Sequence, residues 1–177
     1  MDIIGISGLK GSGKSTLAKQ LVPSTTLPIA WAIKEALLAM GISRKFLYDP
    51  EYKERPSRLL QGKTGRFAMV TLGTEWGRNM MGEDFWLDLW IEKVLTLKGT
   101  IVVDDVRFPN EVEAIRNLGG FVVAVRKPDQ QAKKFWQRWH QSESLRPERY
   151  GIPVIMNDGT PEQLLERFRA LDTSNRS

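Results

Sequence analysis

The sequence predicts an α/β domain built on a mostly parallel sheet. Three segments are rich in β-branched residues and lack polar alternation, namely DIIGIS at 2–7, TIVVDDV at 100–106 and FVVAV at 121–125. Strands of this composition need apolar cover on both faces, and a segment with helical spacing follows each of them. The chain has 177 residues, which suits one domain of this class with insertions.

The first half of the chain carries mainly helical patterns. The segment KSTLAKQLV follows a glycine-rich turn and ends before Pro23. A second segment with helical spacing, residues 28–40, ends just before Gly41. Residues 42–63 are polar and contain prolines, so we expect a loop there. The spacing of apolar residues predicts helices over 14–22, 28–40, 64–81 and 83–98.

Helices and strands alternate in the second half. Pro109 opens a helix that runs through Leu118 and is stopped by two glycines. IPVIM at 152–156 predicts a last strand, and TPEQ at 160–163 predicts a capping box that opens a final helix to about Leu171. Between these elements we expect a helix over 128–139 and a polar loop over 140–151.

The residue composition excludes several kinds of site. There is no cysteine, so a disulfide scaffold, a cysteine zinc site and thiol catalysis are ruled out. His140 is the only histidine, so one chain cannot form a multi-histidine metal site. No apolar run has the length of a membrane span, and the N-terminus lacks the pattern of a signal peptide. We therefore expect a cytoplasmic protein with no membrane partner.

The charge balance points to an anionic partner. The chain has 26 basic and 21 acidic residues, a net charge of +5. No run of five or six like charges occurs, which argues against a basic tail that binds nucleic acid. Small polyphosphate molecules are the other candidates, and the first twenty residues favour them.

The first strand runs into GLKGSGKS at 8–15, which matches the phosphate-loop pattern G-x-x-x-x-G-K-[ST]. Glycines let successive backbone N–H groups turn toward phosphate oxygens, and the helix that follows directs its positive end to the same point. Lys14 would reach the β- and γ-phosphates, and the Ser15 hydroxyl would bind Mg²⁺. The motif therefore predicts ATP and Mg²⁺ as ligands, with Gly11, Ser12, Gly13, Lys14, Ser15 and Thr16 at the ATP.

Two acids end the second β-branched strand. Asp104 and Asp105 lie at the carboxyl end of this strand, just before Arg107. Ligands of open α/β sheets bind beyond the carboxyl ends of the strands, where an acid can hold a metal directly or through water. Because neighbouring residues on a strand face opposite ways, we expect only one of the two acids to face the site.

Several segments of the chain recur together in one known family. They are ISGLKGSGKST at 6–16, LGTEWGR at 72–78, DFW at 84–86, DDVRFPNEVEAIRNLGG at 104–120, HQSE at 140–143 and NDGT at 157–160. In this order they resemble the phage-type deoxynucleoside monophosphate kinases, a branch of the P-loop nucleoside monophosphate kinases. The phosphate loop alone is shared by many enzymes, whereas DVRFPNE followed by two glycines and a later H-x-S-E is much more particular.

The resemblance implies a single P-loop kinase domain over 1–177, in three layers around a parallel sheet. It also implies a helical insertion over 24–98 that binds the monophosphate and a lid over 127–151. Such enzymes transfer the γ-phosphoryl group of ATP to a deoxynucleoside monophosphate, with Mg²⁺, giving the diphosphate and ADP. A phage origin would place the protein in the host cytoplasm.

Site residues follow from the matching positions. Asp105 matches the family acid better than Asp104 does, and the resemblance assigns it to Mg²⁺ or to acceptor orientation. Lys14, Asp105 and Arg107 form the expected catalytic set, and Ser15 and Asp105 the expected metal ligands. The residues expected at the acceptor are Lys10, Trp76, Arg78, Arg107, Arg138, His140 and Glu143.

Three further residues are expected at the donor base. Arg126 follows FVVAV, where nucleotide kinases of this type often place an arginine on the adenine face, and a planar guanidinium suits that contact. Asn157 and Gly159 lie in NDGT, which would line the adenine pocket with backbone groups. The same four residues equally suit a simple turn before the capped helix.

Two other functions are compatible with the motifs. A different small P-loop kinase would phosphorylate another metabolite, and an alcohol acceptor would need a base near Asp105. An ATP-dependent nucleic-acid-binding module is the alternative from another class, but the chain is short and has no basic stretch. We therefore expect small-molecule substrates and no stable nucleic-acid complex, with a homodimer left open.

Overall fold

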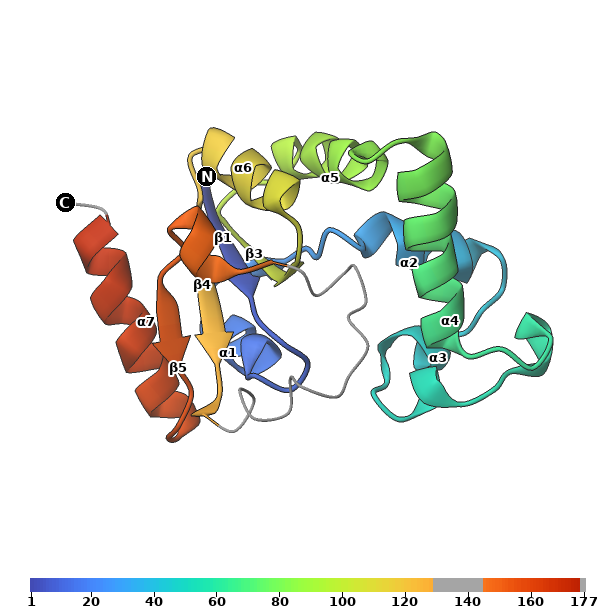
Figure 1. Ribbon diagram of the computed structural model, residues 1–177, viewed down its shortest axis with the longest axis horizontal. Coiled ribbons are helices and arrows are strands. Elements are labelled where there is room, and N and C mark those ends of the chain that lie inside the picture. Colours follow the sequence, from blue (N-terminus) through green and yellow to red (C-terminus); the bar gives the residue numbers. More distant parts are fainter. Residues whose placement is uncertain (129–144, 176–177) are drawn as a thin grey trace. The chain divides into compact units, whose positions relative to one another are not determined.

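The computed structural model describes residues 1–128 and 145–175. These residues form two compact units (Figure 1). The first contains Met1–Pro28 and the described part of Thr96–Ser177, and the second is Ile29–Leu95. The second unit lies within the segment 24–98 that is expected to bind the monophosphate.

The first unit is built on a five-stranded sheet in which every pairing is parallel (Figure 1). The central strand β1 (Asp2–Ser7) lies between β3 (Thr100–Val106) and β4 (Phe121–Arg126). The edges are β2 (Thr25–Thr26), beside β3, and β5 (Val154–Met156), beside β4. The predicted parallel sheet is confirmed, and all five strands end at one edge.

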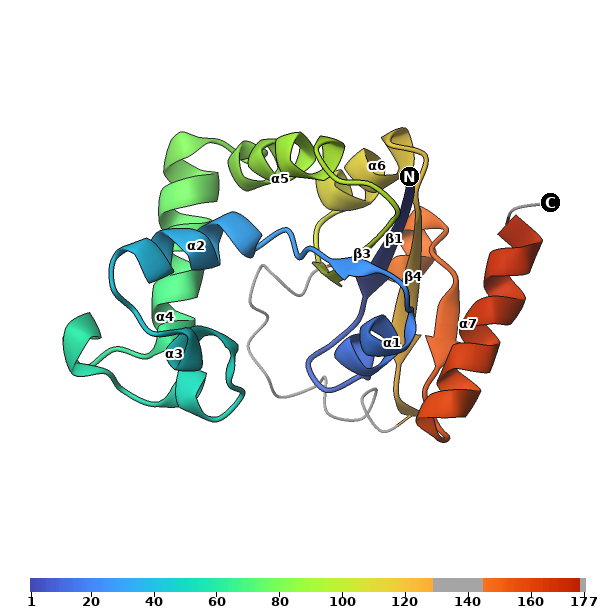
Figure 2. The same cartoon turned by 180° about the vertical axis from the view of Figure 1, so that it is seen from behind.

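Helices cover both faces of this sheet, as the β-branched strands require. Helices α1 (Lys14–Gln20) and α7 (Pro161–Asn175) pack on one face of the sheet (Figure 2). Leu17 of α1 and Phe168 of α7 join strand residues such as Ile6 in one core there. Helix α6 (Pro109–Asn117) lies on the other face, with Ile115 beside Gly5 of β1. Alternate residues of each strand thus enter opposite layers.

The start of α7 confirms the predicted capping box. The backbone N–H of Thr160 donates to Gln163 Oε1 over 2.8 Å, and the N–H of Gln163 donates to Thr160 Oγ1 over 3.3 Å. The reciprocal bonds satisfy two N–H groups at the helix start. The helix continues to Asn175, beyond the predicted end near Leu171.

The second unit is helical. Its core contains Ile33, Leu37, Ile42, Leu47 and Trp86. The α-helices are α2 (Trp31–Ala39), α3 (Arg44–Tyr48), α4 (Gly65–Val70) and α5 (Phe85–Leu95). Short 3₁₀ helices η1 (Tyr52–Glu54) and η2 (Arg58–Leu60) precede α4, and the π-helix η3 (Thr71–Met81) follows it.

The loop predicted over 42–63 is instead partly helical. Leu47 of α3 is buried in the core of the second unit, which anchors a segment whose other residues are mostly polar. Asp49 then organises the next turn, since its Oδ1 accepts hydrogen bonds from the N–H groups of Glu51 and Tyr52. These N–H groups, that of Tyr52 foremost, lower the pKa of the Asp49 carboxyl.

The helix predicted over 64–81 is present but widens into a π-helix from Thr71. The indole N–H of Trp86 donates to the carbonyl of Gly73 over 3.0 Å, so one backbone acceptor of this helix has a side-chain partner. A Cβ at Gly77 would lie 1.9 Å from the same indole nitrogen. Glycine at this position therefore allows Trp86 to pack against the helix, which sequence spacing alone did not indicate.

Strand β2 was not predicted. It has only two residues, too few for a recognisable pattern, and it pairs with Ile101 and Val102 of β3. Nearly all of the predicted helix over 128–139 and the first five residues of the predicted loop over 140–151 lie outside the described residues. The rest of that loop is described, and Pro147–Tyr150 within it forms the 3₁₀ helix η7. Within the described residues, no helix is both long and apolar enough to cross a bilayer.

The docking of α7 on the sheet gives a test of the core. Phe168 is 2% exposed and its ring stacks on that of Phe121, so Phe168→Ala should lower the free energy of unfolding by about 3–5 kcal/mol. Glu166→Ala, at an exposed position of the same helix, should change it by less than about 0.5 kcal/mol. Urea denaturation measures both, and equal losses would contradict this packing.

Candidate active site

The phosphate-loop motif lies at the carboxyl end of β1, between the strand and α1. Gly8 and Gly13 adopt φ of 140° and 110°, which side chains disfavour. A Cβ at Gly8 would also lie 2.3 Å from the carbonyl oxygen of Val125 in β4. The loop is therefore packed directly against the neighbouring strand, which leaves no room for a side chain at its first position.

The Lys14 ammonium turns back over the loop. Its Nζ donates to the carbonyl oxygens of Gly8 over 2.6 Å and of Leu9 over 2.9 Å. The positive charge is thus held at the loop itself, where the motif expects phosphate oxygens to lie. Of the other predicted loop residues, Gly11, Ser15 and Thr16 are exposed and Gly13 is half-buried, whereas Ser12 is buried.

Ser15 faces the acid-bearing strand. Its hydroxyl donates to Asp104 Oδ2 over 3.4 Å. The strand is irregular there, because Gly5 pairs with Val103 while Ser7 pairs with Val106, so β3 contains one extra residue. Bulges of this kind redirect side chains and are common beside active sites. The structure thus brings Asp104 to Ser15, whereas the family resemblance favoured Asp105, whose assignment stays a prediction.

The turn after β3 is held by a residue that sequence reasoning missed. Glu111 is 4% exposed, and its Oε2 accepts hydrogen bonds from the N–H groups of Arg107 (2.6 Å) and Phe108 (3.0 Å). A carboxylate at the third helical position, two residues after Pro109, is a signal that could have revealed this contact. Glu111 therefore fixes the backbone of Arg107, which is an exposed residue.

Arg126 and Asn157 lie at the ends of β4 and β5. The guanidinium of Arg126 forms an ion pair with Glu148, and its backbone carbonyl accepts a hydrogen bond from the N–H of Asn157 over 2.7 Å. The Asn157 side chain donates to the carbonyl of Ser12 over 2.8 Å, so Asn157 contacts the phosphate loop itself. Gly159 lies in the following turn, where a Cβ would be 2.0 Å from Gln163 Oε1.

Lys10 lies exposed in the loop, while two other predicted acceptor residues lie in the second unit. Arg78 is half-buried in η3. Trp76 is 38% exposed and packs edge-on against Phe85, with ring centroids 5.4 Å apart. Trp76 therefore presents appreciable surface, whereas the neighbouring Trp86 is buried in the core.

The second unit also has a basic region over residues 43–66. This segment contains seven basic and three acidic residues. Several cations lie over aromatic rings: Lys45 Nζ is 3.4 Å and the Arg55 guanidinium carbon 4.5 Å from the centroid of the Tyr52 ring. Lys45, through a hydrogen bond and its charge, lowers the pKa of the Tyr52 hydroxyl. Seven basic and three acidic residues give the segment a net charge of +4, compared with +5 for the whole chain.

The remaining predicted residues, Arg138, His140 and Glu143, lie outside the described part of the chain. Most of the predicted lid over 127–151 lies there too. Their assignment to the acceptor therefore stays a prediction.

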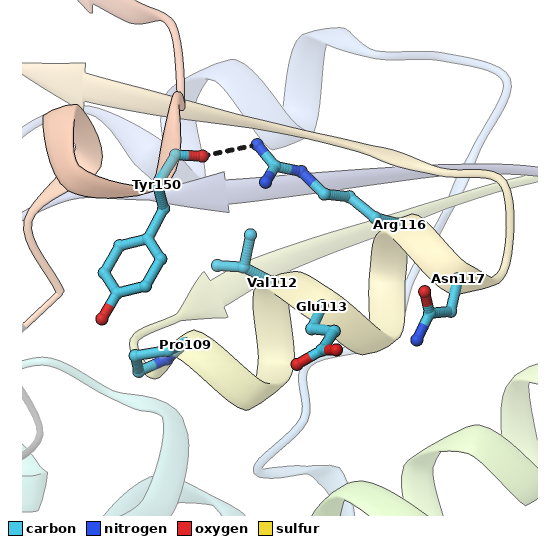
Figure 3. Close-up of a pocket in the computed structure, with 6 residues that line it drawn as sticks. All are labelled: Pro109, Val112, Glu113, Arg116, Asn117 and Tyr150. Carbon is cyan, nitrogen blue, oxygen red and sulfur yellow. Dashed lines mark hydrogen bonds between the residues drawn. The ribbon is translucent and has the colours of Figure 1, made fainter.

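Two surface pockets lie away from the phosphate loop. One, of about 280 Å³, is lined by residues of α6 and by Tyr150 of η7 (Figure 3). Arg116 donates to the carbonyl of Tyr150 over 2.9 Å across this pocket, which ties η7 to α6. The other, of about 530 Å³, lies between β5 and α7. Neither is lined by a residue of Gly8–Ser15.

The described residues do not form a complete metal site by themselves. They contain no group of three or more His, Asp or Glu side chains placed to hold an ion. The Ser15 hydroxyl and the Asp104 carboxylate nevertheless supply two oxygen donors 3.4 Å apart, and Mg²⁺ prefers oxygen. Magnesium is usually held by one or two protein oxygens together with substrate phosphates, so these two donors fit that ion.

Comparisons with known proteins match the chain to one family. The family model described as deoxynucleotide monophosphate kinase matches residues 61–168. A protein of Acanthamoeba polyphaga mimivirus, named as a candidate deoxynucleotide monophosphate kinase, is 30% identical over 148 residues, which cover 72% of this chain and 75% of that protein. The deoxynucleotide monophosphate kinase of Enterobacteria phage T4 is 30% identical over 108 residues, 59% of this chain and 43% of that enzyme.

A solved structure supports the fold. The crystal structure of TT1252 from Thermus thermophilus superposes with a TM-score of 0.54 and covers 99% of this chain and 97% of that protein. The two sequences are 20% identical, so this likeness concerns the architecture alone.

The Glu111 contact predicts a stability difference between two carboxylates of one helix. Glu111→Ala would leave the N–H groups of Arg107 and Phe108 without their carboxylate acceptor, and should lower the free energy of unfolding by about 2–3 kcal/mol. Glu113→Ala, at an exposed position of α6, should cost less than about 0.5 kcal/mol. Urea denaturation of both variants compares them, and a loss no larger for Glu111→Ala would show that its carboxylate does not hold this turn.

Proposed function

The chain belongs to the deoxynucleotide monophosphate kinase family, and we propose that it transfers the γ-phosphoryl group of ATP to the phosphate of a deoxynucleoside monophosphate, giving the diphosphate and ADP. The observation that carries the choice of donor is the folded loop Gly8–Ser15, with the Lys14 ammonium over it and the Ser15 hydroxyl beside Asp104. This combination suits a nucleoside triphosphate.

Loop packing supports a role in binding the triphosphate. Gly8 lies so close to β4, and Gly13 so close to Asn157, that a Cβ at either position would clash. A backbone without side chains allows phosphate oxygens to approach its N–H groups. In this proposal the loop holds the triphosphate, and Lys14 leaves the carbonyls of Gly8 and Leu9 to reach the β- and γ-phosphates.

The reaction asks mainly for alignment and positive charge. The acceptor is a phosphate oxygen that is already ionised near neutral pH, so no strong general base is needed. This oxygen forms a bond to the γ-phosphorus, while the bond from the γ-phosphorus to the oxygen bridging to the β-phosphate breaks. That oxygen leaves with ADP, so atoms and electrons balance without another reactant.

Cationic side chains offset the repulsion between two polyanions. Lys14 stabilises charge on the transferred group, and we propose that Arg107 contacts the acceptor phosphate or that group. Glu111 keeps the backbone of Arg107 in place through the hydrogen bond to its N–H. Lys10 and the residues Trp76 and Arg78 of the second unit are proposed for acceptor binding, as the family resemblance suggests.

We propose that Mg²⁺ accompanies the donor and that Ser15 and Asp104 hold it. When bound, the ion would neutralise charge on the β- and γ-phosphates. The hydrogen bond between Ser15 and Asp104 favours Asp104 for this role. Asp105 then serves to orient the acceptor, the other role that the family resemblance gives it.

Lys14 provides the central test of this function. Lys14→Ala should lower kcat/KM on the order of 10²–10³-fold, because the charge on the transferred group loses its stabilisation. Lys19→Ala, at an exposed position of α1, is the matched control and should retain activity. ADP release is measured in a coupled assay with each common ribo- and deoxyribonucleoside monophosphate as acceptor. Near-normal turnover by Lys14→Ala would overturn the donor site, and turnover with none of these acceptors would overturn the proposed reaction.

The roles of Asp104 and Asp105 can be distinguished by how the activity of each variant depends on the Mg²⁺ concentration. Asp104→Asn should raise the Mg²⁺ concentration for half-maximal activity about tenfold, because it removes a charged oxygen donor. Asp105→Asn should leave that concentration within about twofold and raise the KM of the acceptor instead, since we assign it to acceptor orientation. Magnesium titration of both variants decides the matter. A raised requirement in Asp105→Asn alone would return the metal to Asp105.

A further inference from the structure

We infer that Asn157 is a positioning residue of the phosphate loop, which it holds through the carbonyl of Ser12. The inference rests on the proposed binding of a nucleoside triphosphate by this loop, and it gives Asn157 a role other than the contact with adenine expected from the sequence. Asn157 would act on every triphosphate in the same way, whatever base it carries, because its contact is to the loop backbone.

The sheet brings Asn157 to the loop. Strand β5 pairs with β4 up to Met156 opposite Arg126, and the N–H of Asn157 then donates to the carbonyl of Arg126 over 2.7 Å. Strand β4 in turn pairs with β1, whose carboxyl end runs into the phosphate loop. Because these strands are parallel, the residue after β5 lies at the same sheet edge as the loop.

The contact fixes the orientation of one peptide group. Asn157 Nδ2 lies 2.8 Å from the Ser12 carbonyl oxygen, and a carbonyl can only accept, so the amide NH₂ must face it. In a planar trans peptide the C=O and N–H bonds point in opposite directions. Holding the Ser12 carbonyl on Asn157 therefore directs the N–H of Gly13 away from Asn157. Phosphate loops bind their ligand through N–H groups of this kind.

The loop residues Ser12 and Gly13 leave room for the contact between Asn157 and the Ser12 carbonyl. A Cβ at Gly13 would lie 2.2 Å from Asn157 Nδ2, so the amide occupies the space that a side chain would need. Ser12 is 0% exposed, and its hydroxyl has no hydrogen-bond partner among the described residues. The Ser12 side chain therefore points into the protein, and its backbone carbonyl is the part that Asn157 holds.

A series of ligands distinguishes loop positioning from adenine binding. Asn157→Ala should raise the Kd of ATP, GTP and inorganic tripolyphosphate by the same factor, about tenfold, because all three would bind the loop through the same phosphate contacts. The isosteric variant Asn157→Asp should raise all three further, since a carboxylate cannot donate to the Ser12 carbonyl and repels phosphate. Titration calorimetry with Mg²⁺ gives the dissociation constants, and thermal unfolding checks that each variant is folded.

Asp158→Ala is the matched control in the same turn. Asp158 pairs with Arg167 on the surface, so its removal should leave all three dissociation constants within about twofold. In kinetic assays, Asn157→Ala should raise the KM for ATP and leave the KM for the acceptor unchanged.

Two results would overturn the inference. A loss of ATP affinity with tripolyphosphate affinity intact would make Asn157 a base contact, and unchanged affinity for all three ligands would remove any role in the loop. Failure of the unsubstituted protein to bind ATP and tripolyphosphate would instead overturn the donor site, and with it this inference, so the two failures are distinguishable.

Discussion

Parallel pairing of β1 with β3 and β4 is the constraint on which the candidate site depends. The carboxyl ends of parallel strands lie at one edge of the sheet, and the residues that follow each strand lie there too. The phosphate loop, the acids of β3 and the turn after β5 are therefore neighbours. The apolar layers on both faces maintain this pairing. The geometry of the candidate site in the first unit therefore follows from sheet register, and an error of one residue in that register would separate Asp104 from Ser15.

Two polar side chains outside the phosphate-loop motif hold the backbone of the site. Glu111 accepts from the N–H groups of Arg107 and Phe108, and Asn157 donates to the carbonyl of Ser12. Both side chains bond to main-chain atoms, so they can orient the loops in which the candidate functional residues lie. Loops bear function most readily where a rigid scaffold positions them, and these contacts join the loops to α6 and β5.

Continuous apolar runs were sufficient to predict β1, β3, β4 and β5, and helical spacing was sufficient for most helices, because each of these segments is long enough to show its pattern. Sequence patterns failed for β2, whose two residues are too few to show one, and for α3, where Leu47 is a single buried residue in a polar segment. In the candidate site, the motif predicted Lys14 and Ser15, but a bulge in β3, which the motif does not indicate, decides which acid of that strand faces Ser15. Asn157 was placed near the donor, while its contact with Ser12 depends on a pairing between segments 145 residues apart.

In the proposed reaction, the two carbonyl contacts of Lys14 would lower the affinity of the loop for phosphate. An ammonium held by the carbonyls of Gly8 and Leu9 has already exchanged part of its hydration for protein oxygens. Phosphate oxygens that take this cation replace neutral acceptors by charged ones, and charge-assisted hydrogen bonds are the stronger kind. In the proposed reaction the net gain is therefore the difference between two sets of bonds, so the affinity for nucleotide would be lower than the new phosphate contacts of Lys14 alone would give.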